Sequence, residues 1–204
     1  MDHGLFSMVH GPWSMVSLPL SPFTSHFLSD LVKHTIRFIL FILFQVYVLD
    51  NIRLHQMITP YIYFMFILWL PFKMGRSTQM ILAFLLGMTL DSFRHHPGFH
   101  AAACVLIAYV RPFLINLLIP QETSDTTYAE PSIKSLGGMV PFMIYAGVLI
   151  FIHNAWLFLL EAWQFENVWY FFIKTIATTA VCILLVLITE LIFTRKQRFR
   201  TNTK

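Results

Sequence analysis

One short stretch of the chain gathers the residue types that metal binding or acid–base chemistry requires. Asp91, Arg94, His95, His96 and His100 fall within ten positions, between two apolar runs. Asp91, His95 and His100 are of types that bind zinc, and an aspartate with a histidine can form a catalytic pair. The stretch is therefore a metal site, a catalytic pair, or a polar turn that another molecule recognises.

The order of residues in this stretch favours the turn. Pro97 and Gly98 are a turn signal and end any helix before His100, which separates the third ligand candidate from the first two. His95 and His96 are neighbours and point apart on a helix. The chain shows no Ser/His/Asp order, Gly-rich phosphate loop or paired catalytic carboxylates. We predict no catalytic residue, no metal and no cofactor; a membrane-embedded enzyme using the turn is an alternative.

Seven further polar residues interrupt apolar runs, where an ionisable group needs a partner or a purpose. They are Gln45, Arg111, His153, Asn154, Glu161, Lys174 and Glu190. At about 1.5 Å per helical residue, most of them lie with Asp91 in the outer half of a bundle. Hydrogen bonds between helices account for such a cluster; a binding site or a contact for another protein's helix is the alternative. A proton or ion path would usually show more carboxylates at graded depths.

Arg111 lies deeper, in the fourth apolar run, and Pro112 follows it. Proline removes a backbone donor and tends to kink a helix. A neighbouring arginine can then satisfy the freed carbonyls or reach toward the inner interface. Glu190, near the inner end of the last apolar run, is a candidate partner for it.

The composition indicates which elements position these residues. Hydrophobic residues make up 57% of the chain and charged residues 12%, with a mean hydropathy of +0.66. A soluble domain carries roughly twice that charge. Strict strand alternation is absent, so we predict an all-α integral membrane protein. Cys104 and Cys182 lie in apolar runs and are interpreted as packing residues, not as a disulfide.

Six apolar segments predict a bundle of about six transmembrane helices, with aromatic residues extending the shorter ones into the interface. They cover residues 34–50, 57–72, 78–93, 99–119, 138–160 and 168–193. Segment 57–72 is opened by Pro60 and closed by Pro71, which leaves open whether it spans the bilayer fully.

We divide the chain into an N-terminal extension, residues 1–30, a six-helix membrane domain, residues 31–194, and a basic cytoplasmic tail, residues 195–204. The extension has no Lys or Arg and many Ser, Pro and His, so it does not resemble a signal peptide. We expect it to be loosely structured or interfacial. The membrane pattern begins only near Leu31, which is compatible with a true start codon downstream of Met1.

The basic residues are distributed unevenly between the two sides of this bundle. Ten lie on the side of the C-terminus, namely Lys33, Arg37, Lys73, Arg76, Lys134 and the five of the tail, and two lie opposite, Arg53 and Arg94. By the positive-inside rule both termini are cytoplasmic and the turn at residues 91–100 faces outward. A basic tail after an apolar helix is typical of a face attracted to anionic lipid, so the net charge of +4 does not indicate nucleic acid.

Residues 84–114, "FLLGMTLDSFRHHPGFHAAACVLIAYVRPFL", resemble the rod shape-determining protein MreD family, in the form found in Bacteroidetes. The matching residues of the turn are Gly87, Asp91, Pro97, Gly98 and His100, followed by Ala101, Ala102 and Ala103. The "VRP" of residues 110–112, "FQVYVLDNI" of 44–52 and "HNAWLFLLEAW" of 153–163 fit the same form. The resemblance covers roughly residues 32–193.

The resemblance implies a non-enzymatic, multi-pass subunit of the bacterial inner membrane that supports side-wall peptidoglycan synthesis and the regulation of cell shape. Its implied partners are the bitopic MreC, the actin-like MreB, and the elongation polymerase with its transpeptidase. The implied fold is similar to the substrate-binding subunits of energy-coupling-factor transporters. No catalytic residue carries over, so the functional candidates are those of the turn, with Arg94 among them.

A transporter subunit of that kind is the alternative function. Such subunits dock their membrane partner through small residues of the first span, typically A-x-x-x-A. The first span here, "HTIRFILFILFQVYVLD", contains no Ala or Gly. This departure favours the cell-elongation interpretation.

Overall fold

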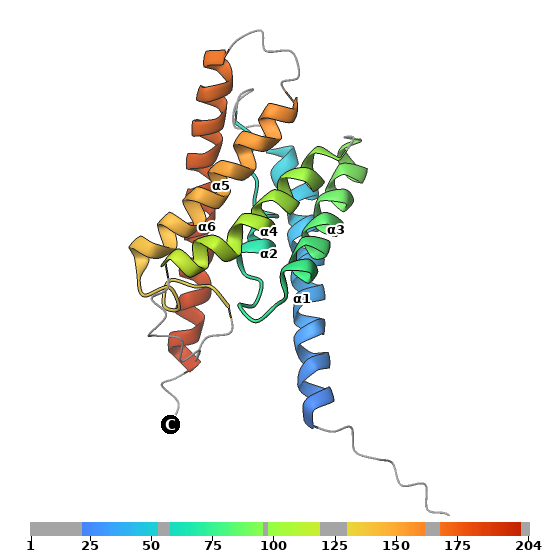
Figure 1. The fold of residues 1–204 in the computed structure, drawn as a ribbon, viewed down its shortest axis with the longest axis vertical. Helices are drawn as coiled ribbons and strands as arrows, with labels where there is room; N and C mark the ends of the chain where they lie inside the picture. Colours follow the sequence, from blue (N-terminus) through green and yellow to red (C-terminus); the bar gives the residue numbers. More distant parts are fainter. Residues whose placement is uncertain (1–21, 53–57, 96–97, 119–129, 162–167, 201–204) are drawn as a thin grey trace, which may run out of the picture. The chain divides into compact units, whose positions relative to one another are not determined.

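The computed structural model describes residues 22–52, 58–95, 98–118, 130–161 and 168–200. The chain divides into two units, residues 1–35 and 36–204, and every contact below lies within the second. The elements are α1 (Pro22–Tyr47), the 3-10 turn η1 (Leu49–Asn51), α2 (Met65–Leu68), α3 (Arg76–Arg94), α4 (Phe99–Leu118), α5 (Met139–Glu161) and α6 (Val168–Arg200) (Figure 1). The described residues contain no β-strand, as predicted.

Within the described residues, four helical segments are long and apolar enough to cross a membrane. They are Val32–Asn51, Phe99–Leu118, Met139–Glu161 and Val168–Ile192. The predicted spans at residues 34–50, 99–119, 138–160 and 168–193 agree with these four within a few residues. Toward the termini, α1 begins at Pro22, inside the predicted extension, and α6 continues to Arg200, inside the predicted tail.

The burial pattern differs from that of a water-soluble helical protein, because many polar side chains are buried and many apolar ones are exposed. The described chain buries many polar side chains: Gln45, Gln79, Asp91, His100, Arg111, His153, Asn154, Thr175, Thr178, Thr179 and Glu190. Helix α3 buries two of these, Gln79 and Asp91, together with Gly87, but it exposes Ile81, Phe84, Leu85, Met88 and Phe93. A soluble helix turns its apolar face inward, whereas a membrane helix can expose apolar side chains to lipid. The pattern therefore indicates a membrane protein.

The predicted helix over residues 57–72 is wrong. Within residues 58–72 the chain forms only the four-residue α2, between turns and irregular backbone. Every residue from 61 to 70 is buried, so protein surrounds this segment on all sides. The residues of this segment are apolar because they are buried. A short apolar run does not by itself distinguish a helix from other buried backbone. Irregular backbone is tolerated at membrane depth only where protein or a water-filled cavity surrounds it.

This buried segment runs between the two ends of α3. Near its start, the Tyr61 hydroxyl lies 3.5 Å from a guanidinium nitrogen of Arg94, the last residue of α3. At its end, the Leu70 carbonyl accepts a hydrogen bond from Arg111, which also binds Gln79 in the first turn of α3. Helix α3 rises about 22 Å between Gln79 and Arg94, the two residues at which the ends of the segment meet it. Extended backbone covers up to about 3.3 Å per residue, so the segment can make the same crossing without a helix.

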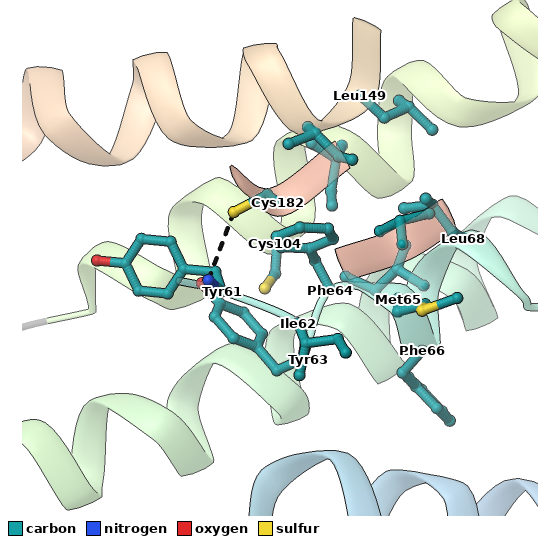
Figure 2. Packing of buried hydrophobic residues seen from close by; sticks show 14 of the residues in the cluster. Tyr61, Ile62, Tyr63, Phe64, Met65, Phe66, Leu68, Cys104, Leu149 and Cys182 are labelled. Atoms are coloured by element: carbon teal, nitrogen blue, oxygen red, sulfur yellow. Dashed lines mark hydrogen bonds between the residues drawn. The ribbon is translucent and has the colours of Figure 1, made fainter. Parts of the chain in front are cut away.

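The hydrophobic core is built around the buried segment (Figure 2). Its side chains pack edge to face against α1, with Phe66 5.4 Å from Phe38 and Trp69 5.8 Å from Phe41 between ring centroids. On α6, the Cys182 Sγ accepts a hydrogen bond from the Tyr61 N–H at 3.4 Å. Cys182 and Cys104 are both free, buried thiols, in agreement with their predicted packing role.

Candidate functional site

Helix α3 ends at Arg94 and helix α4 begins at Phe99, and the predicted turn lies between them. His95 ends α3 in the left-handed region, at φ 56° and ψ 32°, and its N–H donates to the Asp91 carbonyl. Gly98, with φ 86°, precedes α4. A left-handed residue is a common helix terminus, but it is uncommon for a residue other than glycine or asparagine. Pro97 and His96, which we expected in this turn, lie outside the described residues.

The Asp91 carboxylate caps the N-terminus of α4. Its two oxygens accept hydrogen bonds from the backbone N–H groups of His100, at 3.1 Å, and Ala101, at 2.9 Å. The first amides of a helix lack partners within it, and the helix dipole favours a negative charge there. His95 is exposed, so it does not meet Asp91 and the His100 ring as a third metal ligand. No three His, Cys, Asp or Glu side chains of the described residues could hold a metal ion.

Gly87 allows the two helices of this hairpin to approach closely. A Cβ atom at Gly87 would lie 2.3 Å from the Cα and 2.5 Å from the backbone nitrogen of Ala101. Both contacts are with backbone, so no side-chain rotation could relieve them. Small residues that let helix backbones approach are a recurring feature of membrane helix pairs.

Gln45 satisfies the backbone where the buried segment begins. Its amide nitrogen donates to the Pro60 carbonyl at 3.1 Å and to Asp50 Oδ1 at 2.8 Å. Its amide oxygen accepts from the Ile62 N–H at 2.9 Å. This side chain therefore supplies hydrogen bonds that a helix would have formed within itself.

Arg94 and Asp50 form an ion pair next to Gln45. The Arg94 Nε donates to Asp50 Oδ2 at 3.0 Å, and Nη2 donates to Oδ1. The two side chains remain 16% and 21% exposed, and the guanidinium lies 5.1 Å from the Tyr61 ring centroid. Burial alone would lower the pKa of Arg94, but the hydrogen bond and charge of Asp50 outweigh burial and raise it. Arg94 therefore remains a cation and a hydrogen-bond donor.

A chain of hydrogen bonds leads from Arg94 into the bundle. Arg94 Nη1 lies 3.3 Å from His100 Nε2, and His100 Nδ1 lies 2.8 Å from the Tyr63 hydroxyl. Tyr63 is also 2.8 Å from His153 Nε2, and His153 Nδ1 is 3.2 Å from Asn154 Oδ1. The Asn154 amide nitrogen then donates to Thr179 at 3.2 Å. We call these six residues from Arg94 to Thr179 the polar chain.

The polar chain joins only part of the predicted outer cluster. Gln45, His153 and Asn154 are linked through it, while the Asp91 side chain is engaged with the α4 backbone. Lys174 and Glu161 form a separate ion pair of 3.0 Å, with the Lys174 ammonium 4.1 Å from the Phe158 ring centroid. Hydrogen bonding between helices, the first of the two interpretations of the cluster, describes these contacts.

A second polar group surrounds Arg111, which is fully buried. Its guanidinium donates to the Tyr145 hydroxyl at 3.0 Å, to Gln79 Oε1 at 2.9 Å and to the Leu70 carbonyl. Tyr145 in turn donates to the Leu68 carbonyl at 2.9 Å. Arg111 does satisfy a free carbonyl, but that carbonyl belongs to the buried segment and not to its own helix.

The candidate pairing of Arg111 with Glu190 is not formed. Glu190 accepts instead from the Trp69 indole N–H at 3.2 Å and from the Ile133 N–H at 3.2 Å. Glu190 lies in the C-terminal half of α6. Its partner was not predicted, because sequence does not indicate that an irregular segment with its own hydrogen-bonding needs lies between α4 and α6.

Three residues of the polar chain and its Arg94–Asp50 ion pair were not singled out from the sequence. Asp50 closes the first apolar run, Tyr63 lies inside an aromatic-rich run, and Thr179 lies in "TIATTA". Tyrosine and threonine are common in membrane spans, so neither carries a signal by itself. Asp50 did carry one, since a carboxylate at the end of an apolar run needs a partner.

Together the fold and the site define a helical protein in which four helices of the described part of the chain could cross a membrane and buried polar groups connect helices to one another. No family model matches the chain, and no curated protein or solved structure matches it either. The residues of the α3–α4 turn and of the polar chain are the features from which a function can be inferred.

Proposed function

We propose that the chain is a non-enzymatic, multi-pass subunit of the bacterial inner membrane that supports side-wall peptidoglycan synthesis and cell shape, as its resemblance to the MreD family implies. The proposed partners are an MreC-like bitopic protein, the elongation polymerase with its transpeptidase, and MreB filaments, bound directly or through MreC. The observation that carries the proposal is the α3–α4 hairpin. The resemblance rests on residues that include Gly87, Asp91, Gly98 and His100. All four of these lie where α3 and α4 meet.

The contacts of the polar residues favour partner binding over catalysis. Asp91, Arg111 and His153 each bind groups of another element of the same bundle. Groups that hold helices together in this way build a rigid scaffold. Among the residues of the hairpin end that the structure describes, Ser92, Phe93 and His95 are exposed. We propose that they belong to the recognition surface, held in place by Asp91.

We further propose that the chain crosses the membrane six times, with both termini cytoplasmic, in an arrangement similar to energy-coupling-factor substrate-binding subunits. Four crossings are the long apolar helices. Helix α3, with its exposed apolar face, and the buried segment that runs alongside it supply the other two. The excess of Lys and Arg on the side of the C-terminus supports this orientation.

Cysteine labelling tests the orientation. His95 and Lys134 are both exposed, and six crossings place them on opposite sides. In spheroplasts, a membrane-impermeant maleimide should label His95→Cys at once and label Lys134→Cys only after permeabilisation. The native Cys104 and Cys182 are buried and give a low background. The reverse pattern, or equal labelling of both positions, would overturn the topology.

Co-purification tests the function. The tagged full chain, solubilised from membranes of the native organism, should retain an MreC-like bitopic protein. Phe93→Ala should lower that recovery about tenfold, because exposed aromatic residues often dominate an interface, and it should give rounded cells. Phe84→Ala is the matched control, since both phenylalanines lie on α3 and are about equally exposed, at 51% and 47%. Membrane levels of both variants should equal that of the wild type.

Two results would count against the proposal. The first is a chain that purifies without any protein of the cell-elongation machinery and whose deletion leaves rod shape intact. The second is a Phe93→Ala variant with normal recovery and normal rods, which would exclude this surface. Equal losses from Phe93→Ala and Phe84→Ala would indicate a general effect on folding and would exclude it too.

A further inference from the structure

Thr178 on α6 carries a buried hydroxyl group that its own helix does not satisfy. Four other hydroxyls of the described helices, those of Thr89, Ser92, Thr175 and Thr189, donate to the carbonyl oxygen four residues earlier. The Thr178 Oγ1 makes no such bond, and it is the one buried side-chain oxygen or nitrogen of the described residues that has no hydrogen-bond partner. A hydroxyl buried in this way is costly unless something binds it, so it points to a ligand.

The next residue, Thr179, has a proton to donate as well. Its Oγ1 accepts a hydrogen bond from the Asn154 amide nitrogen at 3.2 Å. A threonine hydroxyl carries one proton in addition to its acceptor sites, and no group in the described ranges accepts the proton of Thr179. Thr178 and Thr179 are 0% and 7% exposed, so bulk solvent does not supply the acceptor. Two neighbouring donors therefore share the need for one acceptor.

Cys182 brings a sulfur atom to the same place. It follows Thr178 by four residues and Thr179 by three, and side chains at these spacings are neighbours on a helix surface. Cys182 is fully buried, and its Sγ accepts the Tyr61 N–H at 3.4 Å. All three groups are neutral, so an ion bound among them would be buried without a countercharge. The ligand that this set of groups fits is a small, neutral molecule that both accepts and donates hydrogen bonds.

We propose that Thr178, Thr179 and Cys182 bind one buried water molecule. The water accepts the protons of both hydroxyls and donates one of its own to the Cys182 sulfur. It then has three partners, which is usual for a buried water.

This water extends the polar chain past Thr179. Asn154 donates to Thr179, Thr179 donates to the water, and the water donates to the sulfur that also receives the Tyr61 N–H. Side chains of α5 and α6 and the backbone of the buried segment thus meet through one solvent molecule. The inference rests on the burial and the contacts of these residues, and it does not depend on which partner the chain binds.

Transfer of magnetisation from water detects the site in the wild-type chain. In the full chain in lipid bilayers, labelled with ¹³C-threonine, solid-state NMR should show rapid transfer from water to Thr178 and Thr179, as to the exposed Thr78. Thr175 is the matched control, since it is equally buried but bonded within its own helix, and its signal should grow slowly. Signals are assigned from the Thr178→Val and Thr179→Val variants. A Thr178 signal that grows as slowly as that of Thr175 would overturn the proposal.

Thermal stability gives a second test, because the two alternatives differ in sign. Thr178→Val keeps the shape of the side chain and removes the hydroxyl, so loss of a water contact should lower the thermal midpoint by about 3 °C. Removal of a hydroxyl that binds nothing would raise the midpoint and would exclude the site. Thr175→Val should change the midpoint little, and Thr178→Ser should retain the rapid transfer from water. Since one water joins both threonines, the effects of Thr178→Val and Thr179→Val should not add, and additive effects would exclude a shared water.

Discussion

Gly87→Ala is expected to lower the thermal midpoint of the detergent-solubilised chain by on the order of 5 °C and to reduce its level in the membrane. The added Cβ would lie 2.3 Å from the Ala101 Cα, a distance that a real contact does not reach. Since the opposing atoms are backbone, α4 must move away from α3. Overpacking of this kind costs about 1 to 3 kcal/mol, and Gly87→Val should cost more.

Gly147→Ala on α5 is the matched control, and its effect should have the opposite sign. The nearest side chain to a Cβ at Gly147 is Ile183, at 3.7 Å, an ordinary contact. Alanine in a helix interior is favoured over glycine by about 0.5 to 1 kcal/mol, so Gly147→Ala should be neutral or stabilising. If both variants raised the thermal midpoint, the close approach of α3 and α4 at Gly87 would be excluded.

Arg111→Met should destabilise the chain by several kcal/mol, enough to leave little folded protein. Two effects compete, because methionine removes a buried cation but also three hydrogen bonds. Transfer of an arginine to mid-bilayer costs about 3 kcal/mol. Hydrogen bonds to a charged group contribute about 1.5 to 3 kcal/mol each, and the Leu70 carbonyl would be left buried without a donor. The lost hydrogen bonds outweigh the gain, so the net effect is loss of stability.

Two variants calibrate this effect in the same thermal assay. Arg76→Met removes an exposed arginine that lies 5.1 Å from the Phe113 ring centroid, and its effect should stay near 0.5 kcal/mol. Tyr145→Phe removes one Arg111 partner and the donor to Leu68, and its effect should be intermediate. Since the two residues share one network, the effects of Arg111→Met and Tyr145→Phe should not add. An Arg111→Met chain as stable as the wild type would contradict the role of Arg111 in holding the buried segment.

Much of the helical framework could be predicted because it depends on properties that each segment carries by itself. Three apolar runs are long enough to cross a bilayer as helices, namely those near residues 99–119, 138–160 and 168–193. A helix is stable there because its backbone N–H and C=O groups form hydrogen bonds within the helix itself. The turn signal that includes Gly98 was equally local, and Gly98 has a positive φ just before α4.

The segment at residues 57–72 shows where this reasoning stops. Hydropathy records that a segment avoids water, and it has the same value for a helix in lipid as for irregular backbone enclosed by protein. Only the surrounding helices decide between the two. Here Gln45, Arg111 and Tyr145 supply the hydrogen bonds that a helix would otherwise have made.

The same limit applies to the polar residues. Their presence inside apolar runs showed from sequence alone that they need partners, since an unpaired polar group is costly there. Which partner each one meets depends on the rotation and depth of several helices at once, to within an ångström or two. This is why Arg111 binds the Leu70 carbonyl and not Glu190, and why His100 and His153 meet at Tyr63, a residue whose sequence context gave no sign of it.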